Sequence, residues 1–395
     1  MPLGLYISVP FCRTKCSYCN FASDVFSRAL FENYVARICS EVERSHQTTR
    51  QMGGLLESKV DSIYFGGGTP TLLDVAQLDR VFVTIRQNFE VTRDAEITLE
   101  CAPGTLSGEM LAGLSRSGVN RISLGVQSFI DKESAAVGRL HNQQTVLGDI
   151  ARLRSAGVSN INIDLIAGLP YQTRESWSRS LEELITLKVP HASIYMLEID
   201  EDSRLGRELL AGGQRYHAHF VPDEDLTAEL YETACECLNA AGIVQYEISN
   251  FARAGFESRH NLKYWTRQPY FGFGVDAHSM LSSDGKTGAV RFSNADSLEK
   301  YLAKSSRERT AVSPESALQE AFFLGLRLNS GVDLADLAAR HGSRELTAFR
   351  DGISELISDG LLERCNEVIR LTARGRLLSN EVFQRFVADA STVGT

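Results

Sequence analysis

Short apolar segments alternate with amphipathic segments over about the first 200 residues of the chain. The apolar segments are rich in Ile, Val, Leu and Tyr, which is typical of buried parallel strands. The segments between them repeat apolar residues along one helix face, as Phe31, Tyr34, Val35 and Ile38 do. This alternation predicts an α/β fold, a partial (β/α)6 barrel with its chemistry at the carboxyl ends of the strands. The six expected strands are residues 3–9, 60–65, 96–100, 121–125, 160–165 and 193–198.

The pattern changes after about residue 200. We expect a helix over 225–240, a strand over 244–248 and then an irregular, aromatic and Gly-rich segment over 251–292. Helices follow from residue 313, with a hairpin over 361–371 and a last helix over 374–387, which is the outline of a winged helix. The expected domains are the barrel (1–215), a barrel extension (216–312) and an α+β winged-helix-like C-terminal domain (313–395).

Charge narrows the list of partners. The 395 residues include 41 Lys and Arg against 50 Asp and Glu, a net charge of -9. An acidic chain is repelled by phosphate backbones, so we expect no nucleic-acid partner. The C-terminal segment from Ser313 carries nine Arg and no Lys against twelve Asp and Glu. This balance favours a packing or lid domain over a DNA-binding winged helix.

Three of the 8 cysteines fall within the first 19 residues. The sequence has no apolar run long enough to span a membrane and no signal-peptide pattern at its start, so we expect a cytoplasmic chain with reduced thiols. Clustered cysteines in that compartment indicate metal binding or catalysis rather than disulfides. The other five cysteines are expected to be ordinary core or surface thiols.

The clustered cysteines are Cys12, Cys16 and Cys19, in a C-x3-C-x2-C pattern directly after the first expected strand. Three thiolates on one loop can hold three corners of a [4Fe-4S] cluster and leave the fourth iron open to a ligand. A zinc site with three cysteines and one histidine is the alternative. Its nearest histidine, His46, lies on the following expected helix, which makes the iron–sulfur cluster the favoured reading.

The cysteine pattern resembles that of the radical S-adenosylmethionine (radical SAM) enzymes. Further segments resemble the oxygen-independent coproporphyrinogen III oxidase family within that superfamily, and two C-terminal ones resemble the family's C-terminal domain. The resemblance covers nearly the whole chain and implies that S-adenosylmethionine binds at the open iron. The matching segments are 6–12 (YISVPFC), 64–70 (YFGGGTP), 118–129 (GVNRISLGVQSF), 162–170 (NIDLIAGLP), 324–327 (LGLR) and 371–375 (LTARG).

The resemblance also implies which residues contact S-adenosylmethionine. Glycines in the GGG run would let the backbone approach the ligand closely, and Arg139 could hold a carboxylate with two parallel hydrogen bonds. An ionisable residue at the end of a barrel strand, such as Glu100, is a typical binding position. The implied contacts are Tyr6, Tyr18, Gly67, Gly68, Thr69, Glu100, Gln127, Arg139, Asp164 and His278.

Two departures separate this chain from the oxidases. Phe21 stands where they carry a further cysteine, and we expect no counterpart of the extension that precedes their first strand. Both features resemble the HemW-type heme chaperone branch, whose His-Asn-x-x-Tyr-Trp motif is present as His260, Tyr264 and Trp265. Imidazole ligates heme iron, and aromatic rings can cover a porphyrin face. The alternative is that His260 is a hydrogen-bonded structural histidine.

The resemblance therefore implies a heme chaperone that binds heme and passes it to an acceptor protein. A membrane-associated respiratory enzyme is one such acceptor, reached through peripheral contact with the membrane. The alternative is an oxidase that decarboxylates coproporphyrinogen III to protoporphyrinogen IX. A third reading, a nucleic-acid-modifying radical SAM protein, is disfavoured by the acidic C-terminal segment. His46, His191 and His341 are expected at the surface, and His217 and His219 lie in a polar stretch.

Overall fold

The computed structural model describes residues 1–285, 287–303 and 307–387. One twelve-stranded sheet dominates it, and six parallel strands that are consecutive in the chain occupy the middle of that sheet. All six match expected strands, so the predicted partial (β/α)6 barrel is confirmed. The strands are β1 (Leu3–Val9), β2 (Lys59–Gly67), β3 (Glu90–Cys101), β4 (Arg121–Gln127), β5 (Asn160–Ala167) and β6 (His191–Met196).

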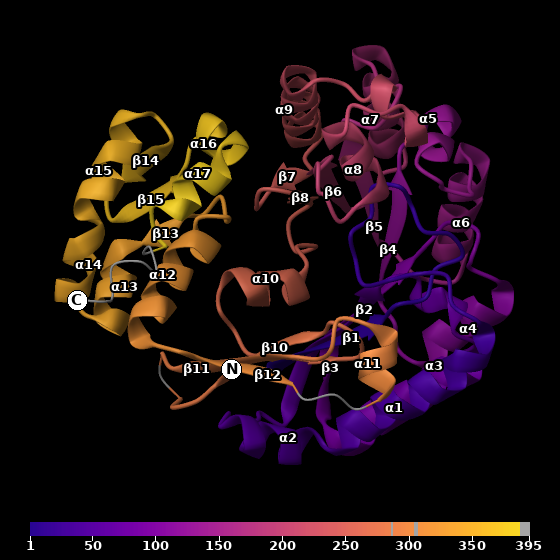
Figure 1. Ribbon diagram of the computed structural model, residues 1–395, viewed down its shortest axis with the longest axis horizontal. Helices are drawn as coiled ribbons and strands as arrows, with labels where there is room; N and C mark the ends of the chain where they lie inside the picture. Colours follow the sequence, from indigo (N-terminus) through magenta and orange to yellow (C-terminus); the bar gives the residue numbers. More distant parts are fainter. Residues whose placement is uncertain (286, 304–306, 388–395) are drawn as a thin grey trace.

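Helices line the outer side of the curved sheet (Figure 1). Their starts follow from local sequence: Asp74 and Thr173 accept hydrogen bonds from the first turns of the helices that follow them. The helices up to the sixth strand are α1 (Phe31–Glu43), α2 (Ser45–Met52), α3 (Val75–Asn88), α4 (Gly108–Arg116), α5 (Asp131–Ala136), α6 (Gln143–Ser155) and α7 (Arg174–Thr186), with short 3-10 helices η1 (Arg28–Leu30) and η2 (Pro70–Leu72).

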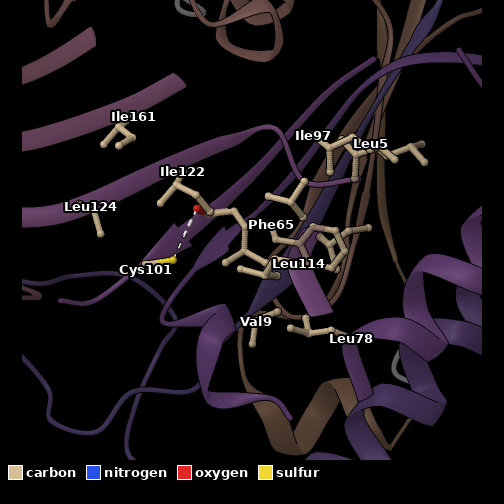
Figure 2. Close-up of a cluster of buried hydrophobic side chains, with 14 of the residues drawn as sticks. Leu5, Val9, Phe65, Leu78, Ile97, Cys101, Leu114, Ile122, Leu124 and Ile161 are labelled. Carbon is tan, nitrogen blue, oxygen red and sulfur yellow. Dashed lines mark hydrogen bonds between the residues drawn. The ribbon is translucent and has the colours of Figure 1, made fainter. Parts of the chain in front are cut away.

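The two faces of the barrel strands differ in polarity. The outer face packs an apolar core against the helices, and Figure 2 shows part of it, including Leu5, Phe65 and Ile97. Cys101 belongs to this core, as expected for an ordinary thiol, and its Sγ lies 3.9 Å from the carbonyl oxygen of Leu99. Side chains alternate between the two faces of a strand, and the polar side chains of these strands lie on the inner face. The apolar residues that identify these strands in the sequence are therefore those of the outer face only.

Further strands extend the sheet at both edges, and this corrects one expectation. Residues 251–292 are not irregular: they contain a helix and most of the added strands. The added strands are only 2 to 5 residues long and are stabilised by pairing with β1, with β6 and with one another. The added strands beside β1 are β9 (Tyr270–Phe273), β10 (His278–Ser282), β11 (Ala289–Ser293) and β12 (Glu308–Val312). Those beside β6 are β8 (Asn250–Ala252) and β7 (Val244–Gln245), the latter shorter than the expected strand.

Four helices and one 3-10 helix connect these strands. The expected helix over 225–240 is confirmed and begins after Asp223, which caps it. One short helix, α10, lies inside the curve of the sheet rather than outside it (Figure 1). The elements are α8 (Arg204–Leu210), η3 (Arg215–Phe220), α9 (Glu224–Ala240), α10 (Arg259–Trp265) and α11 (Leu298–Leu302).

The C-terminal part has its own apolar core and a three-stranded sheet, β13-β15-β14. The hairpin is confirmed, but the expected last helix over 374–387 is two short helices separated at Leu378. Leu377 packs on the barrel core and Leu378 on the C-terminal core, so the chain turns between them. The elements are α12 (Pro314–Gly325), β13 (Val332–Asp333), α13 (Leu334–His341), α14 (Ser343–Leu346), η4 (Thr347–Phe349), α15 (Arg350–Ser358), β14 (Leu362–Cys365), β15 (Val368–Leu371), α16 (Ala373–Leu377) and α17 (Ser379–Gln384).

Within the described ranges, every helix is too short or too polar to cross a bilayer.

Candidate functional site

The cysteine loop connects β1 to α1 and runs across the carboxyl edge of the barrel, beside β4 and β5 (Figure 1). It is fastened to the segment that follows β4. The Thr14 hydroxyl donates to the carbonyl oxygen of Gly138 at 3.0 Å, and the Ser17 N–H donates to that of Val137 at 3.1 Å. The loop is thereby placed where the chemistry of a parallel barrel is expected.

Two side chains direct hydrogen-bond donors at the cysteine sulfurs. Arg139 Nη1 lies 3.6 Å from Cys16 Sγ, and the Thr69 hydroxyl oxygen lies 4.0 Å from Cys12 Sγ. Donors around a cluster's sulfur ligands stabilise their negative charge, so these residues fit a three-cysteine iron–sulfur site. In the described residues, no three Cys, His, Asp or Glu side chains are already gathered as a ligand set. The loop would have to close around the metal, and the ligand role of Cys12, Cys16 and Cys19 stays a prediction.

The glycine run at the end of β2 is required by the fold itself. Gly67 has a φ of +94°, which favours glycine. A Cβ on Gly68 would lie 2.7 Å from the carbonyl oxygen of Val9, and one on Gly66 would lie 2.8 Å from Glu100 Oε1. These close approaches hold β2 against β1 and β3, so the run has a packing role beside the ligand contact expected for it.

Glu100 and Asp164 are satisfied by neighbours on the inner face. Glu100 accepts hydrogen bonds from the Tyr64 hydroxyl at 2.8 Å and from the Gly67 N–H at 3.2 Å. Burial, together with the charge of Asp164, raises the pKa of Glu100 to about 7. Asp164 accepts from Ser123 at 3.1 Å and from Asn162 at 2.7 Å, and burial raises its pKa as well. The site thus holds a carboxyl group that exchanges a proton near neutral pH.

The other expected cofactor contacts lie around the same edge. Gln127, which has a φ of 71°, and Arg139 both approach Gly125: a Cβ there would lie 3.1 Å from Gln127 Nε2 and 3.2 Å from Arg139 Nη2. Tyr18 packs on the apolar cluster that includes Val137 and Ile166.

Tyr6 completes this group, because a Cβ added to Gly67 would lie 3.2 Å from the Tyr6 hydroxyl. His278 stands apart from it. Its side chain is 69% exposed at the start of β10, and its Nε2 lies 3.8 Å from Asp276. The structure therefore brings nine of the ten expected residues together, while His278 lies two strands from Tyr6 in the sheet with an exposed side chain.

The His-Asn-x-x-Tyr-Trp motif forms α10 and lies toward the opposite, amino-terminal end of the barrel interior. His260 is 1% exposed, with Nδ1 3.0 Å from the Ser62 hydroxyl and Nε2 2.9 Å from the Tyr264 hydroxyl. Burial, with the charges of Lys263 and Arg121, lowers the pKa of His260 to about 3. Both ring nitrogens are engaged, as in a structural histidine.

The rest of the motif also faces protein. Glu96 on β3 accepts hydrogen bonds from the backbone N–H of His260 at 3.0 Å, and Lys263 pairs with Asp61 at 2.7 Å. The ring of Trp265 lies under the guanidinium of Arg327, 4.2 Å from the ring centre. Helix α10 therefore packs against the amino end of the barrel strands, and through Trp265 it also contacts the C-terminal part.

Sequence reasoning missed the polar inner face, and it misplaced His191. This residue is fully buried on β6, with Nδ1 2.6 Å from Asn162 Oδ1 and Nε2 2.9 Å from the Tyr246 hydroxyl. The signal was available in part, because every second residue is polar in some of the expected strands, as in Glu96, Thr98 and Glu100. The expectation of a surface position was wrong because a polar barrel interior buries polar residues in hydrogen-bonded layers.

Two cavities open on the amino-terminal side, away from the cysteine loop. One, of about 420 Å³, lies at the start of β3, and the other, of about 220 Å³, is lined by Glu96, Asn160 and Arg259. Neither includes an expected cofactor contact.

Comparison with known proteins decides the family. The radical SAM superfamily model matches residues 6–184, and the HemN C-terminal domain model matches residues 312–378. The heme chaperone HemW of Bacillus subtilis is 35% identical over 97% of this chain and 99% of its own length. The HemW of Lactococcus lactis is 33% identical, over 98% of both chains. The chain belongs to the HemW family.

The fold of this HemW-family chain also has a solved counterpart. Coproporphyrinogen III oxidase (HemN) from Escherichia coli superposes with a TM-score of 0.80 over 98% of this chain and 90% of that one, at 24% sequence identity. The resemblance seen in the motifs is thus confirmed at the level of family and fold. Membership of the radical SAM superfamily implies a [4Fe-4S] cluster and S-adenosylmethionine.

Proposed function

We propose that this HemW-family protein binds heme and transfers it to an acceptor protein. The observation that carries the proposal is the match, over nearly the full length of both chains, to relatives named heme chaperones. A local feature supports it: the position that holds a further cysteine in the oxidases is Phe21, a residue that is 64% exposed on the cysteine loop.

Cys12, Cys16 and Cys19 are proposed to hold the [4Fe-4S] cluster, which when bound supplies electrons for reductive cleavage of S-adenosylmethionine. Arg139 would balance the negative charge of the thiolates. Tyr18 offers a flat ring next to the cysteines. The proposed contacts of S-adenosylmethionine are Tyr6, Tyr18, Gly67, Gly68, Thr69, Glu100, Gln127, Arg139 and Asp164, with His278 as an outer candidate.

The heme contacts expected at His260, Tyr264 and Trp265 meet an obstacle. Iron ligation by His260 would require Nε2 to release the Tyr264 hydroxyl, 2.9 Å away, or Nδ1 to release Ser62. The heme-binding proposal therefore rests on family membership rather than on this imidazole. We retain the motif as a candidate that would have to open before it could bind heme.

The alternative function is oxidation of coproporphyrinogen III, favoured by the likeness to the HemN fold. Two assays on anaerobically reconstituted protein decide between the functions. Incubation with coproporphyrinogen III, S-adenosylmethionine and a reductant should give no protoporphyrinogen IX. Titration with heme should give a saturable absorbance change. Formation of protoporphyrinogen IX would overturn the chaperone proposal.

The setting of the protein is proposed on the same grounds. We place it in the cytoplasm, with a membrane-associated respiratory enzyme as an acceptor that it meets through peripheral membrane contact. The net charge of -9 argues against a nucleic-acid partner. Residues 1–215, 216–312 and 313–395 are proposed as barrel, extension and packing domain, with the Trp265–Arg327 contact between the last two.

A further inference from the structure

Arg121 is a buried arginine whose side chain has no bonded partner in the described part of the chain. It begins β4 and is 1% exposed, among the largest fully buried side chains of the protein. Its Nε is enclosed without a hydrogen-bond acceptor, and no ion pair joins its guanidinium to a described carboxylate. A buried charge without a direct hydrogen-bond or ion-pair partner is costly, so a site of this kind persists only where something else stabilises it.

Strand register places Arg121 on the polar inner face. Arg121 precedes Ser123 by two residues, and the Ser123 hydroxyl donates to Asp164 inside the barrel. Gly125, next on the same face, is where Gln127 and Arg139 meet at the carboxyl edge. Arg121, Ser123 and Gly125 thus form one line from the interior to the expected cofactor site.

Electrostatics agree with this placement. Burial raises the pKa of both Glu100 and Asp164, and the positive charge of Arg121 opposes that rise. The same charge adds to burial in lowering the pKa of His260. Arg121 therefore acts on groups at both ends of the interior.

The carboxylates near Arg121 are already occupied by other donors. Glu100 accepts from Tyr64 and Gly67, and Asp164 accepts from Ser123 and Asn162, each through both oxygens. Glu96, at the other end, accepts from Ser258, Arg259 and His260 at the start of α10. In the described residues these carboxylates hydrogen-bond to other donors and none bonds directly to Arg121, whose planar guanidinium can pair with a carboxylate from outside the chain.

We propose that Arg121 binds a carboxylate of the ligand that enters the barrel from its carboxyl edge. The inference rests on the proposed function, which offers two sources of this group: a propionate of heme and the methionine carboxylate of S-adenosylmethionine. An arginine suits either, because its fork matches the two carboxylate oxygens. Arg121 is a binding residue in this proposal and takes no part in holding the cluster.

The test compares wild-type protein with Arg121→Gln and Arg121→Lys, all reconstituted with the cluster. Each is titrated with heme, with heme dimethyl ester, which lacks free carboxylates, and with S-adenosylmethionine. Thr98→Val is the matched control, since Thr98 pairs with Arg121 across β3 and β4, is fully buried and carries no charge. Thermal unfolding of each apo variant separates binding from folding.

We expect Arg121→Gln to weaken binding of one carboxylate-bearing ligand at least about tenfold, with Arg121→Lys intermediate and Thr98→Val unchanged. If heme is the source, the dimethyl ester binds wild type and Arg121→Gln alike; if S-adenosylmethionine is the source, only its affinity falls. The apo midpoint should stay equal or rise, because a buried unpaired charge is removed. The proposal would be overturned if Arg121→Gln bound both heme and S-adenosylmethionine with the affinity of wild type, whether or not its unfolding midpoint is lower. A wild-type protein that binds S-adenosylmethionine but not heme contradicts the proposed function, and the Arg121 proposal is then decided by S-adenosylmethionine alone.

Discussion

The two ends of the barrel interior hold their polar side chains in different ways. At the amino end, Glu96 caps α10, both ring nitrogens of His260 are bonded, and Lys263 pairs with Asp61. At the carboxyl end, the three cysteine thiols lie on one loop, with Cys16 buried and the other two partly exposed, and burial raises the pKa of Glu100 to about 7. The His260 imidazole at the amino end is fully hydrogen-bonded without a ligand, whereas the carboxyl end carries groups suited to a cluster and cofactor.

This difference shows that suitable chemistry alone does not make a motif ready to bind a metal. The cysteine motif and the His-Asn-x-x-Tyr-Trp motif both contain good metal ligands. Their surroundings separate them: the sulfurs receive donors from Arg139 and Thr69, while the imidazole of His260 is already saturated. The following experiments test that contrast, from the largest expected effect to the smallest.

Replacing a cysteine at the carboxyl end should have an all-or-none effect. Cys12→Ala, Cys16→Ala or Cys19→Ala removes one of three cluster ligands, so we expect loss of the visible charge-transfer absorption of the reconstituted protein. Cys365→Ala is the control, because that cysteine is exposed on β14, and its spectrum should match wild type. An unchanged spectrum in any of the first three variants would contradict the cluster assignment.

Replacing the histidine at the amino end should affect folding rather than the cluster. His260→Ala leaves the hydroxyls of Ser62 and Tyr264 unpaired and opens a hole in the interior, so we expect a loss of about 4 kcal/mol in the free energy of unfolding. Urea denaturation measures it, with the exposed His46→Ala as control. Normal stability combined with lost heme absorbance would instead make His260 a ligand.

The elevated pKa of Glu100 predicts a pH dependence. Its carboxyl group holds a proton more tightly in the folded than in the unfolded protein, so its stabilising contribution is full below about pH 4.5 and is lost as pH rises to about 7. The Glu100→Gln variant has no carboxyl group at this position and therefore lacks this pH-dependent contribution to stability. The apo variant should therefore gain up to about 3 kcal/mol relative to wild type between pH 4.5 and pH 8, measured by denaturant unfolding at each pH. The exposed Glu57→Gln should show no such trend, and a parallel pH profile for Glu100→Gln would refute the assignment.

The smallest effect is expected from one hydrogen bond at the amino end. Tyr264→Phe removes the hydroxyl that contacts Nε2 of His260 and keeps the ring packed on Tyr270, so we expect a loss of about 1 kcal/mol in stability. Urea denaturation checks this value. A stability equal to wild type together with tighter heme binding would indicate that the hydroxyl competes with iron for the imidazole.

The sequence predicted the barrel because its strands and helices follow local periodicity, as in Leu3–Val9 and the helix that starts at Phe31. It also located the cysteine loop, since the ligand spacing is local. The short strands β9 and β10 could not be predicted in the same way, because β9 is stabilised by pairing with β1, far away in the sequence, and β10 is stabilised in turn by pairing with β9.

The two ends of the interior were harder to separate from sequence. His260 and Cys16 both occupy motifs with metal-binding chemistry, and only the fold shows which one is enclosed by donors and acceptors. His191 was misplaced because its partners, Asn162 and Tyr246, come from distant parts of the chain. Arg121 gave no local signal, since an inward-facing arginine at the start of a strand looks like a solvated one.

Heme titration of the anaerobically reconstituted protein tests the central proposal most directly. We expect a saturable change in heme absorbance with one heme per chain and a dissociation constant of about 1 µM or below, equivalent to roughly 8 kcal/mol of binding free energy. Addition of a heme-free acceptor enzyme should then remove the heme from the complex. An absorbance that rises only in proportion to added heme, with no saturation, would contradict the account.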